Sequence, residues 1–116
     1  MTEVTLYGIP NCDTVKKARR WLDEQGVPYR FHDFKKLGVP AERLAHWVAT
    51  LGWEALVNRR GTTWRKLPAQ EQARVVDAKS AEAALAAHPS LIKRPVVEAG
   101  AKVLVGFDEA AYATLK

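Results

Sequence analysis

Cysteine is nearly absent from this 116-residue chain, which contains a single one, Cys12. One thiol cannot form an internal disulfide, so the small secreted scaffolds that depend on disulfides are excluded. A structural zinc site typically uses at least two cysteines, and the three histidines are scattered along the sequence. We therefore expect no metal site.

Long apolar runs and a targeting segment are also lacking. No stretch approaches the roughly 18–20 apolar residues that span a membrane. The N-terminal sequence MTEVTLYGIP has no basic region followed by an apolar one, so it does not resemble a signal peptide. With 47% hydrophobic and 27% charged residues, the composition is typical of a folded protein. We expect a small cytoplasmic monomer that does not bind membranes.

Acidic residues are missing from one segment, RRGTTWRK at residues 59–66, which carries 4 basic side chains. The flanking regions are nearly balanced, with 8 basic and 7 acidic residues before this segment and 6 of each after it. Most of the net charge of +5 therefore lies in one place. This pattern favours an anion-binding site, and a cluster of this size is a small footprint for nucleic acid.

Strand and helix signals alternate in an order typical of a thioredoxin-like fold. The expected strands are Val4–Tyr7, Tyr29–Phe34, Pro95–Glu98 and Lys102–Val105. The expected helices begin at Asp13, Pro40, Pro68, Ser80 and Asp108 and end near Gly26, Gly52, Val76, Ala87 and Leu115. Ser80 is expected to be a simple N-cap without a capping box, and Asp108 to cap the last helix.

This order predicts an α/β fold in which a β-α-β unit and a β-β-α unit form a thioredoxin-like sandwich. An all-helical insertion is expected between the second and third strands. We predict a single domain over residues 1–116, with the core at about 1–36 and 90–116 and the insertion at about 37–89.

Cys12 is the candidate nucleophile. It lies between the first strand and the first turn of the next helix, where free amides and a partial positive charge stabilise a thiolate relative to a thiol. The alternative is a small buried side chain that follows a turn. A two-cysteine redox motif would place its second thiol at position 15, which is Val15. Any resolving thiol must therefore come from glutathione or another protein.

Arginines at two places are candidate anion-binding groups. Arg59 and Arg60 open the basic segment, where Gly61 is expected to allow a tight turn, and Arg94 precedes Pro95. Guanidinium groups bind carboxylates and oxyanions in a bidentate manner. In a thioredoxin-like sheet the residue before this proline faces the N-terminus of the first helix, and the proline is typically cis. For each arginine alone, the alternative is a solvated cation.

Four segments resemble the ArsC/Spx group of arsenate reductase-like proteins, and most of all its YffB-like branch. They are YGIPNCDTVKKARRWL, GWEALVNRRGTTWRKL, IKRPVV and VLVGF, in this order. The resemblance covers nearly the whole chain and implies a nucleophile at Cys12 and anion-binding arginines at Arg60 and Arg94. Arg59 adjoins Arg60, so which of the two faces the site stays open.

The resemblance to the YffB-like branch implies a glutathione-dependent thiol–disulfide reductase, with glutathione as co-substrate. Cys12, Arg60 and Arg94 are the expected catalytic residues. The residues expected to bind substrate or glutathione are Asn11, Thr14, Lys16, Arg59 and Pro95. The expected substrate is a disulfide or an oxyanion, and glutaredoxin is a candidate partner.

Two alternatives come from the same group. Arsenate reductases of this type supply a third arginine after the R-P strand, whereas residues 101–107 contain none and offer only Lys102, which lacks the planar fork. The Spx branch binds RNA polymerase without catalysis and often carries a two-cysteine switch, which Val15 removes here.

Overall fold

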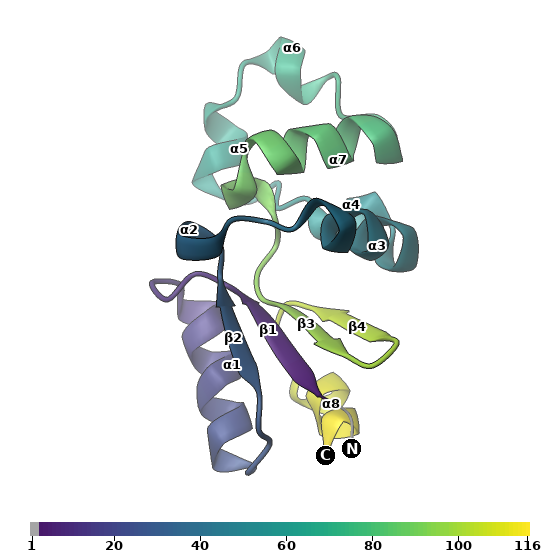
Figure 1. Ribbon diagram of the computed structural model, residues 1–116. Helices are drawn as coiled ribbons and strands as arrows, with labels where there is room; N and C mark the ends of the chain where they lie inside the picture. Colours follow the sequence, from purple (N-terminus) through teal and green to yellow (C-terminus); the bar gives the residue numbers. More distant parts are fainter. Residues whose placement is uncertain (1–2) are drawn as a thin grey trace. The chain divides into compact units, whose positions relative to one another are not determined.

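The structure is a computed structural model that describes residues 3–116 (Figure 1). In chain order the elements are β1 (Val4–Gly8), α1 (Asp13–Glu24), β2 (Arg30–Asp33), α2 (Phe34–Leu37), α3 (Ala41–Leu51), α4 (Trp53–Leu56), α5 (Thr62–Lys66), α6 (Ala69–Gln72), α7 (Ala78–Ala87), η1 (Pro89–Leu91), β3 (Val96–Ala99), β4 (Lys102–Val105), α8 (Glu109–Tyr112) and η2 (Ala113–Leu115). They form two compact units. The sheet unit comprises the chain up to Gly38 together with Arg94–Lys116, and the helical unit comprises Val39–Lys93.

The sheet unit contains a four-stranded sheet in the order β2-β1-β3-β4. β1 pairs in parallel with β2, because the helix α1 returns the chain to the starting end of the sheet. β3 is antiparallel to both β1 and β4. This β-α-β plus β-β-α order, interrupted by a helical segment after the second strand, confirms the predicted α/β thioredoxin-like fold with an all-helical insertion.

One face of the sheet carries the apolar core of this unit. Alternate strand residues point to the same face, so Val4, Leu6 and Val97 pack together against α1 and α8. From α1 the buried side chains of Val15 and Leu22 complete the core at helical spacing. The core therefore fixes α1, and with it the connection that precedes α1, to one end of β1.

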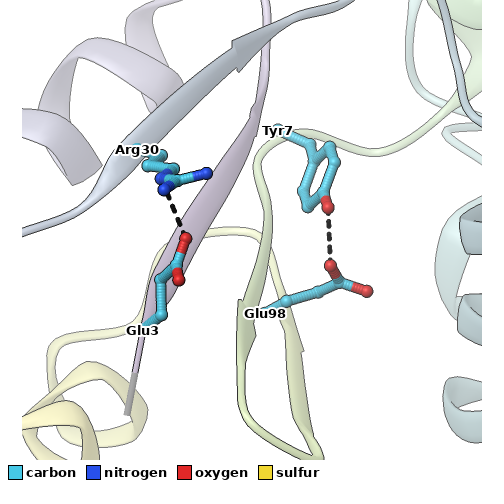
Figure 2. Close-up of polar contacts among 4 residues, drawn as sticks. All are labelled: Glu3, Tyr7, Arg30 and Glu98. Carbon is cyan, nitrogen blue, oxygen red and sulfur yellow. Dashed lines mark hydrogen bonds and ion pairs between the residues drawn. The ribbon is translucent and has the colours of Figure 1, made fainter. Parts of the chain in front are cut away.

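The opposite face of the sheet carries polar side chains beside buried apolar ones, Val96 and Val103. The hydroxyl of Tyr7 on β1 donates a hydrogen bond to Oε1 of Glu98 on β3 at 2.6 Å (Figure 2). At the start of the sheet, Nε of Arg30 lies 2.8 Å from Oε1 of Glu3, an ion pair between exposed side chains (Figure 2). The two faces of the sheet thus differ in chemistry.

The helical unit is built around α3, α4 and α7, which contact one another. Leu44, Trp47 and Val48 recur at helical spacing on α3 and are buried, as is Leu85 on α7. Among the described residues no helix is long and apolar enough to cross a membrane.

Two local predictions in the helical unit were wrong. The helix assigned to Ser80 begins two residues earlier, with Asp77 as N-cap and Ser80 at the third position of a capping box. Asp77 accepts from the amide of Ser80 at 2.8 Å, and the Ser80 hydroxyl accepts from the amide of Asp77 at 3.1 Å. Of the helix expected from Pro68 to Val76 only Ala69–Gln72 is helical, as α6, and the basic segment contains a helix that was not predicted, α5 at Thr62–Lys66.

Candidate functional site

Cys12 is the N-cap of α1. Its backbone is extended, with φ −143° and ψ 123°, and its carbonyl accepts the first helical hydrogen bond from the amide of Lys16 at 2.9 Å. The side chain is half-buried against the apolar core and makes no capping hydrogen bond. The thiol is therefore held at the positive end of a helix while part of its surface faces solvent.

Val15 occupies the position where a two-cysteine motif has its second thiol. Its side chain is fully buried, and its Cγ2 would lie 2.8 Å from a Cβ added to Gly8. Glycine is required at the end of β1 because α1 approaches the strand this closely. The same contact fixes the distance between the sheet and the first turn that follows Cys12.

Arg94 and Pro95 lie at the same end of the sheet as Cys12. Tyr7 on β1 pairs with Val96 on β3, so extending this register by one residue brings Pro95 beside Gly8, where β1 ends. The Arg94–Pro95 peptide bond is cis, as expected from the fold, and Arg94 is half-buried. The register thus brings Arg94 to the end of the sheet from which the chain continues to Cys12.

Three of the other predicted binding residues of this unit lie close to Cys12 in the sequence, and the fourth is Pro95. Asn11 and Lys16 are exposed, and Thr14 is half-buried in the first turn of α1. Pro95 is buried, and its carbonyl accepts from the amide of Gly106 at 2.8 Å. These four residues therefore belong to the same unit as Cys12 and Arg94.

Arg59 and Arg60 lie in the helical unit, in the turn before α5. The guanidinium carbon of Arg59 is 5.6 Å from the ring centre of Trp53 and 5.7 Å from that of Trp64, within the range of cation–π attraction. The side chain of Arg60 is exposed. Both arginines are exposed, and they differ in that the guanidinium of Arg59 lies over two aromatic rings.

Gly61 follows these arginines for a reason that the sequence analysis missed. Its φ is −79°, so the expected tight turn does not depend on the left-handed region. A Cβ at this position would instead lie 2.8 Å from Nδ2 of Asn58. Oδ1 of Asn58 accepts a hydrogen bond from the backbone amide of Arg60 at 3.2 Å, and the backbone amide of Asn58 donates to the carbonyl of Leu91 at 2.8 Å. The N-x-R-G pattern was the sequence signal for these contacts between Asn58 and the turn.

A cavity of about 920 Å³ lies at the opposite end of the sheet unit, where β1 starts. It is bordered by Val4, the α1–β2 connection at residues 25–30 and the C-terminal residues 114–116. It includes none of the predicted site residues. Within residues 3–116, no group of three or more histidine, cysteine, aspartate or glutamate side chains is arranged to hold a metal ion.

Comparison with known proteins identifies the family. The sequence model of the ArsC family matches residues 7–115. The chain belongs to the ArsC family.

Its relatives place this ArsC-family protein in the YffB-like branch. A solved structure of a YffB protein is 50% identical, with a TM-score of 0.92, over 97% of each chain. An uncharacterized protein of Haemophilus influenzae is 42% identical over 109 residues, which are 94% of this chain and 95% of that one. The global transcriptional regulator Spx of Streptococcus pneumoniae is 25% identical over 113 residues, covering 91% of this chain and 80% of the regulator. The relatives of this chain therefore include a transcriptional regulator.

Proposed function

We propose that this ArsC-family protein is a cytoplasmic, glutathione-dependent thiol–disulfide reductase with Cys12 as its nucleophile. The observation that carries the proposal is the position of Cys12 as N-cap of α1, beyond the end of the inner strand β1, with Val15 in place of a second thiol. Amides at a helix N-terminus favour a thiolate. Since Cys12 is the only cysteine of the chain, the thiol that resolves its adduct comes from outside.

The reaction consists of two exchanges. The Cys12 thiolate attacks the glutathione sulfur of a mixed disulfide, the substrate's S–S bond breaks, and the substrate leaves as a thiolate that takes up a proton. A disulfide now joins Cys12 to glutathione. The thiolate of a second glutathione attacks the glutathione sulfur of this adduct, which releases glutathione disulfide and restores the Cys12 thiolate. The substrate gains two electrons, and glutathione supplies them.

Arg94 and Arg60 are the proposed partners of the glutathione carboxylates. Arg94 is supported by the strand register that brings it to the end of β1 from which the chain runs to Cys12. For the second arginine, Arg60 is favoured over Arg59, because the guanidinium of Arg59 already lies over two indole rings. Each guanidinium would bind a carboxylate through two parallel hydrogen bonds. Asn11, Thr14, Lys16 and Pro95 are the further proposed contacts of glutathione.

The proposal is tested by the substitution Cys12→Ser. Glutathione disulfide formation from a glutathionylated peptide and glutathione is expected to fall to the uncatalysed rate, because an alcohol at neutral pH is not a comparable nucleophile. The melting temperature should stay close to that of the wild type, since oxygen replaces sulfur in a half-buried site. Full activity of Cys12→Ser would rule the proposal out.

Arsenate reduction is the second candidate, and membership of the ArsC family favours it. It requires an arsenate adduct on the same thiol, and the third arginine expected of such enzymes is missing between residues 101 and 107. An assay of arsenate-dependent oxidation with glutathione and glutaredoxin separates the two candidates. Reduction of arsenate without any reduction of the glutathionylated peptide would favour arsenate as the substrate.

A regulatory role without catalysis is the third candidate, because Spx regulators are relatives of this chain. Affinity purification from lysate distinguishes it. Recovery of RNA polymerase subunits with wild-type protein and with Cys12→Ser alike would favour this role, whereas capture of glutathionylated proteins that requires Cys12 supports the reductase.

A further inference from the structure

Two elements leave the sheet beside each other at the end where Cys12 lies. Gly8, the last residue of β1, is the register partner of Asp33, the last residue of β2, in a parallel pair whose strands are about 4.8 Å apart. From Gly8 the chain continues to Cys12 and α1, and from Asp33 it enters α2 directly (Figure 1). The chain therefore enters α1 and α2 from the same end of these two neighbouring strands.

Both elements carry exposed cations. They are Lys16, Lys17 and Arg20 on α1 and Lys35 and Lys36 on α2. In the part of the chain that the structure describes, none of the five forms an ion pair. The neighbouring Arg19 differs, since its Nε donates to the Tyr29 hydroxyl at 3.0 Å and its guanidinium covers the Phe31 ring at 4.1 Å. The five cations thus have no structural partner that explains them.

Apart from Asp13 in the first turn, the order of charges along α1 is the reverse of what stabilises a helix. Its cations lie in the first two turns, whereas Asp23 and Glu24 lie in the last turn, which has no basic residue. The helix macrodipole favours acidic side chains at the N-terminus and basic ones at the C-terminus. Sequence choices that oppose local stability without a compensating contact are expected at functional sites. The positive end of α1 is therefore suited to attract anions toward Cys12.

An exposed leucine favours a protein as the partner. Leu37 at the end of α2 is 67% exposed, one of the two most exposed large apolar side chains of the described residues. An apolar contact surrounded by charges is the usual composition of a protein–protein interface. A small anion or a nucleic acid gives no role to a single leucine among lysines, and an anionic bilayer, which could use both, is an outcome that the test below distinguishes.

We propose that Lys16, Lys17, Arg20, Lys35, Lys36 and Leu37 form a docking surface for proteins whose disulfide lies in an acidic environment. This inference rests on the proposed reductase function and adds the class of substrate. The favoured substrate is a glutathionylated protein with acidic residues around the modified cysteine. Opposite charges steer such a partner to the site and raise its association rate at low salt.

The test uses three glutathionylated peptides of equal length, in which glutamate, glutamine or lysine residues flank the cysteine. At low salt the wild type is expected to reduce the glutamate peptide at least about tenfold faster than the glutamine peptide, and salt should remove the preference. The double substitution Lys17→Glu with Arg20→Glu should abolish the preference while leaving the glutamine peptide unaffected. Lys35→Glu with Lys36→Glu should do the same.

The matched control reverses the same number of charges at the other end of the sheet unit, with Lys102→Glu and Lys116→Glu. This control should retain the preference for the glutamate peptide, because both positions lie beside the start of β1, away from Cys12. Equal rates on the glutamate and glutamine peptides, or the same loss in the control, would overturn the docking surface.

A binding measurement separates this inference from the reductase proposal. Cys12→Ser is titrated with a fluorescent glutamate peptide in which serine replaces the cysteine, and the contact is mapped by NMR. Binding at α1 and α2 that weakens severalfold in Leu37→Ser supports the docking surface even if no peptide is reduced, in which case only the reductase proposal fails. Absence of binding, or tighter binding to an oligonucleotide or to anionic vesicles, contradicts it.

Discussion

The sheet unit and the helical unit hold their arginines in different ways. Arg94 is half-buried at the end of a hydrogen-bonded sheet whose register also determines where Cys12 lies. Arg59 and Arg60 lie in an exposed turn that is braced by Asn58 and by two tryptophan rings. The difference teaches that backbone pairing holds Arg94 at the end of the sheet that leads to Cys12, whereas Arg59 and Arg60 depend on contacts within a locally braced turn. Substitutions in the sheet unit should therefore change the rate of exchange, and those in the turn should change affinity.

The largest effect is expected from Arg94→Ala. Loss of a charged, bidentate hydrogen-bonding group typically costs about 1.5–3 kcal/mol, so kcat/KM for glutathione should fall about 10- to 100-fold. The measurement is steady-state formation of glutathione disulfide, with unfolding followed in parallel. Arg94→Lys keeps the charge without the planar fork and should recover only part of the loss. Wild-type kinetics in Arg94→Ala would contradict the proposed binding of glutathione by Arg94.

The next largest effect is expected from Gly8→Ala, which tests how β1 positions Cys12. A new Cβ at 2.8 Å from Cγ2 of Val15 overpacks the junction of β1 and α1, and should lower the free energy of unfolding by about 1–3 kcal/mol. Denaturant titration gives this free energy, and the rate at which an alkylating reagent modifies Cys12 reports whether the surroundings of the thiol have changed. Gly26→Ala is the matched control, because Gly26 has φ 69° but open space around it. It should cost about 1 kcal/mol and leave alkylation unchanged.

A smaller effect, divided between two neighbours, is expected for the arginines of the turn. Arg60→Ala should raise KM for glutathione about tenfold with little change in kcat, because it removes binding present in ground and transition states alike. Arg59→Ala should leave KM nearly unchanged and lower the melting temperature, since it removes contacts with Trp53 and Trp64. Steady-state kinetics and thermal unfolding of both variants test this prediction. A raised KM in Arg59→Ala together with a lowered melting temperature in Arg60→Ala would instead assign the glutathione carboxylate to Arg59.

The smallest effect is expected from Asp77→Ala at the start of α7. Hydrogen bonds from the amide and hydroxyl of Ser80 lower the pKa of the Asp77 carboxyl below its usual value. A lowered pKa in the folded state means that the carboxylate stabilises the protein at neutral pH, and that this contribution disappears as the pH falls through the lowered pKa. The variant should melt a few degrees lower at neutral pH and equally to the wild type in acid.

Asp108→Ala is the matched control for this cap in the sheet unit. Asp108 caps α8 through one hydrogen bond to the amide of Ala110 at 3.0 Å, without a capping box. A smaller decrease in melting temperature is therefore expected. A larger decrease than in Asp77→Ala would show that the caps of the two units do not differ as their hydrogen bonds suggest.

Most of the fold could be predicted from local sequence signals. Gly26 ends α1, and alternating apolar residues mark the strands that follow, so the β-α-β unit follows from the chain itself. The start of α7 was misplaced because both Asp77 and Ser80 are good N-caps, and the D-x-x-S spacing that resolves the choice was overlooked.

The candidate site could be predicted only in part. The N-cap position of Cys12 depends on adjacent residues and was predictable. The engagement of Arg59 by Trp53 and Trp64, which are 6 and 5 positions away in the sequence, depends on how the chain folds back on itself. Local periodicity carries no information on such a contact. The close approach at position 61 also comes from a neighbouring side chain, that of Asn58, rather than from the backbone angle of Gly61.

The most direct test of the central claim is mass spectrometry of the intact protein after mixing with a glutathionylated peptide without free glutathione. The account predicts one glutathione per protein, attached to Cys12, together with peptide released as the free thiol. Addition of glutathione should then restore the unmodified protein and yield glutathione disulfide. Absence of the adduct, attachment of the peptide in place of glutathione, or an adduct that glutathione does not remove would contradict the account.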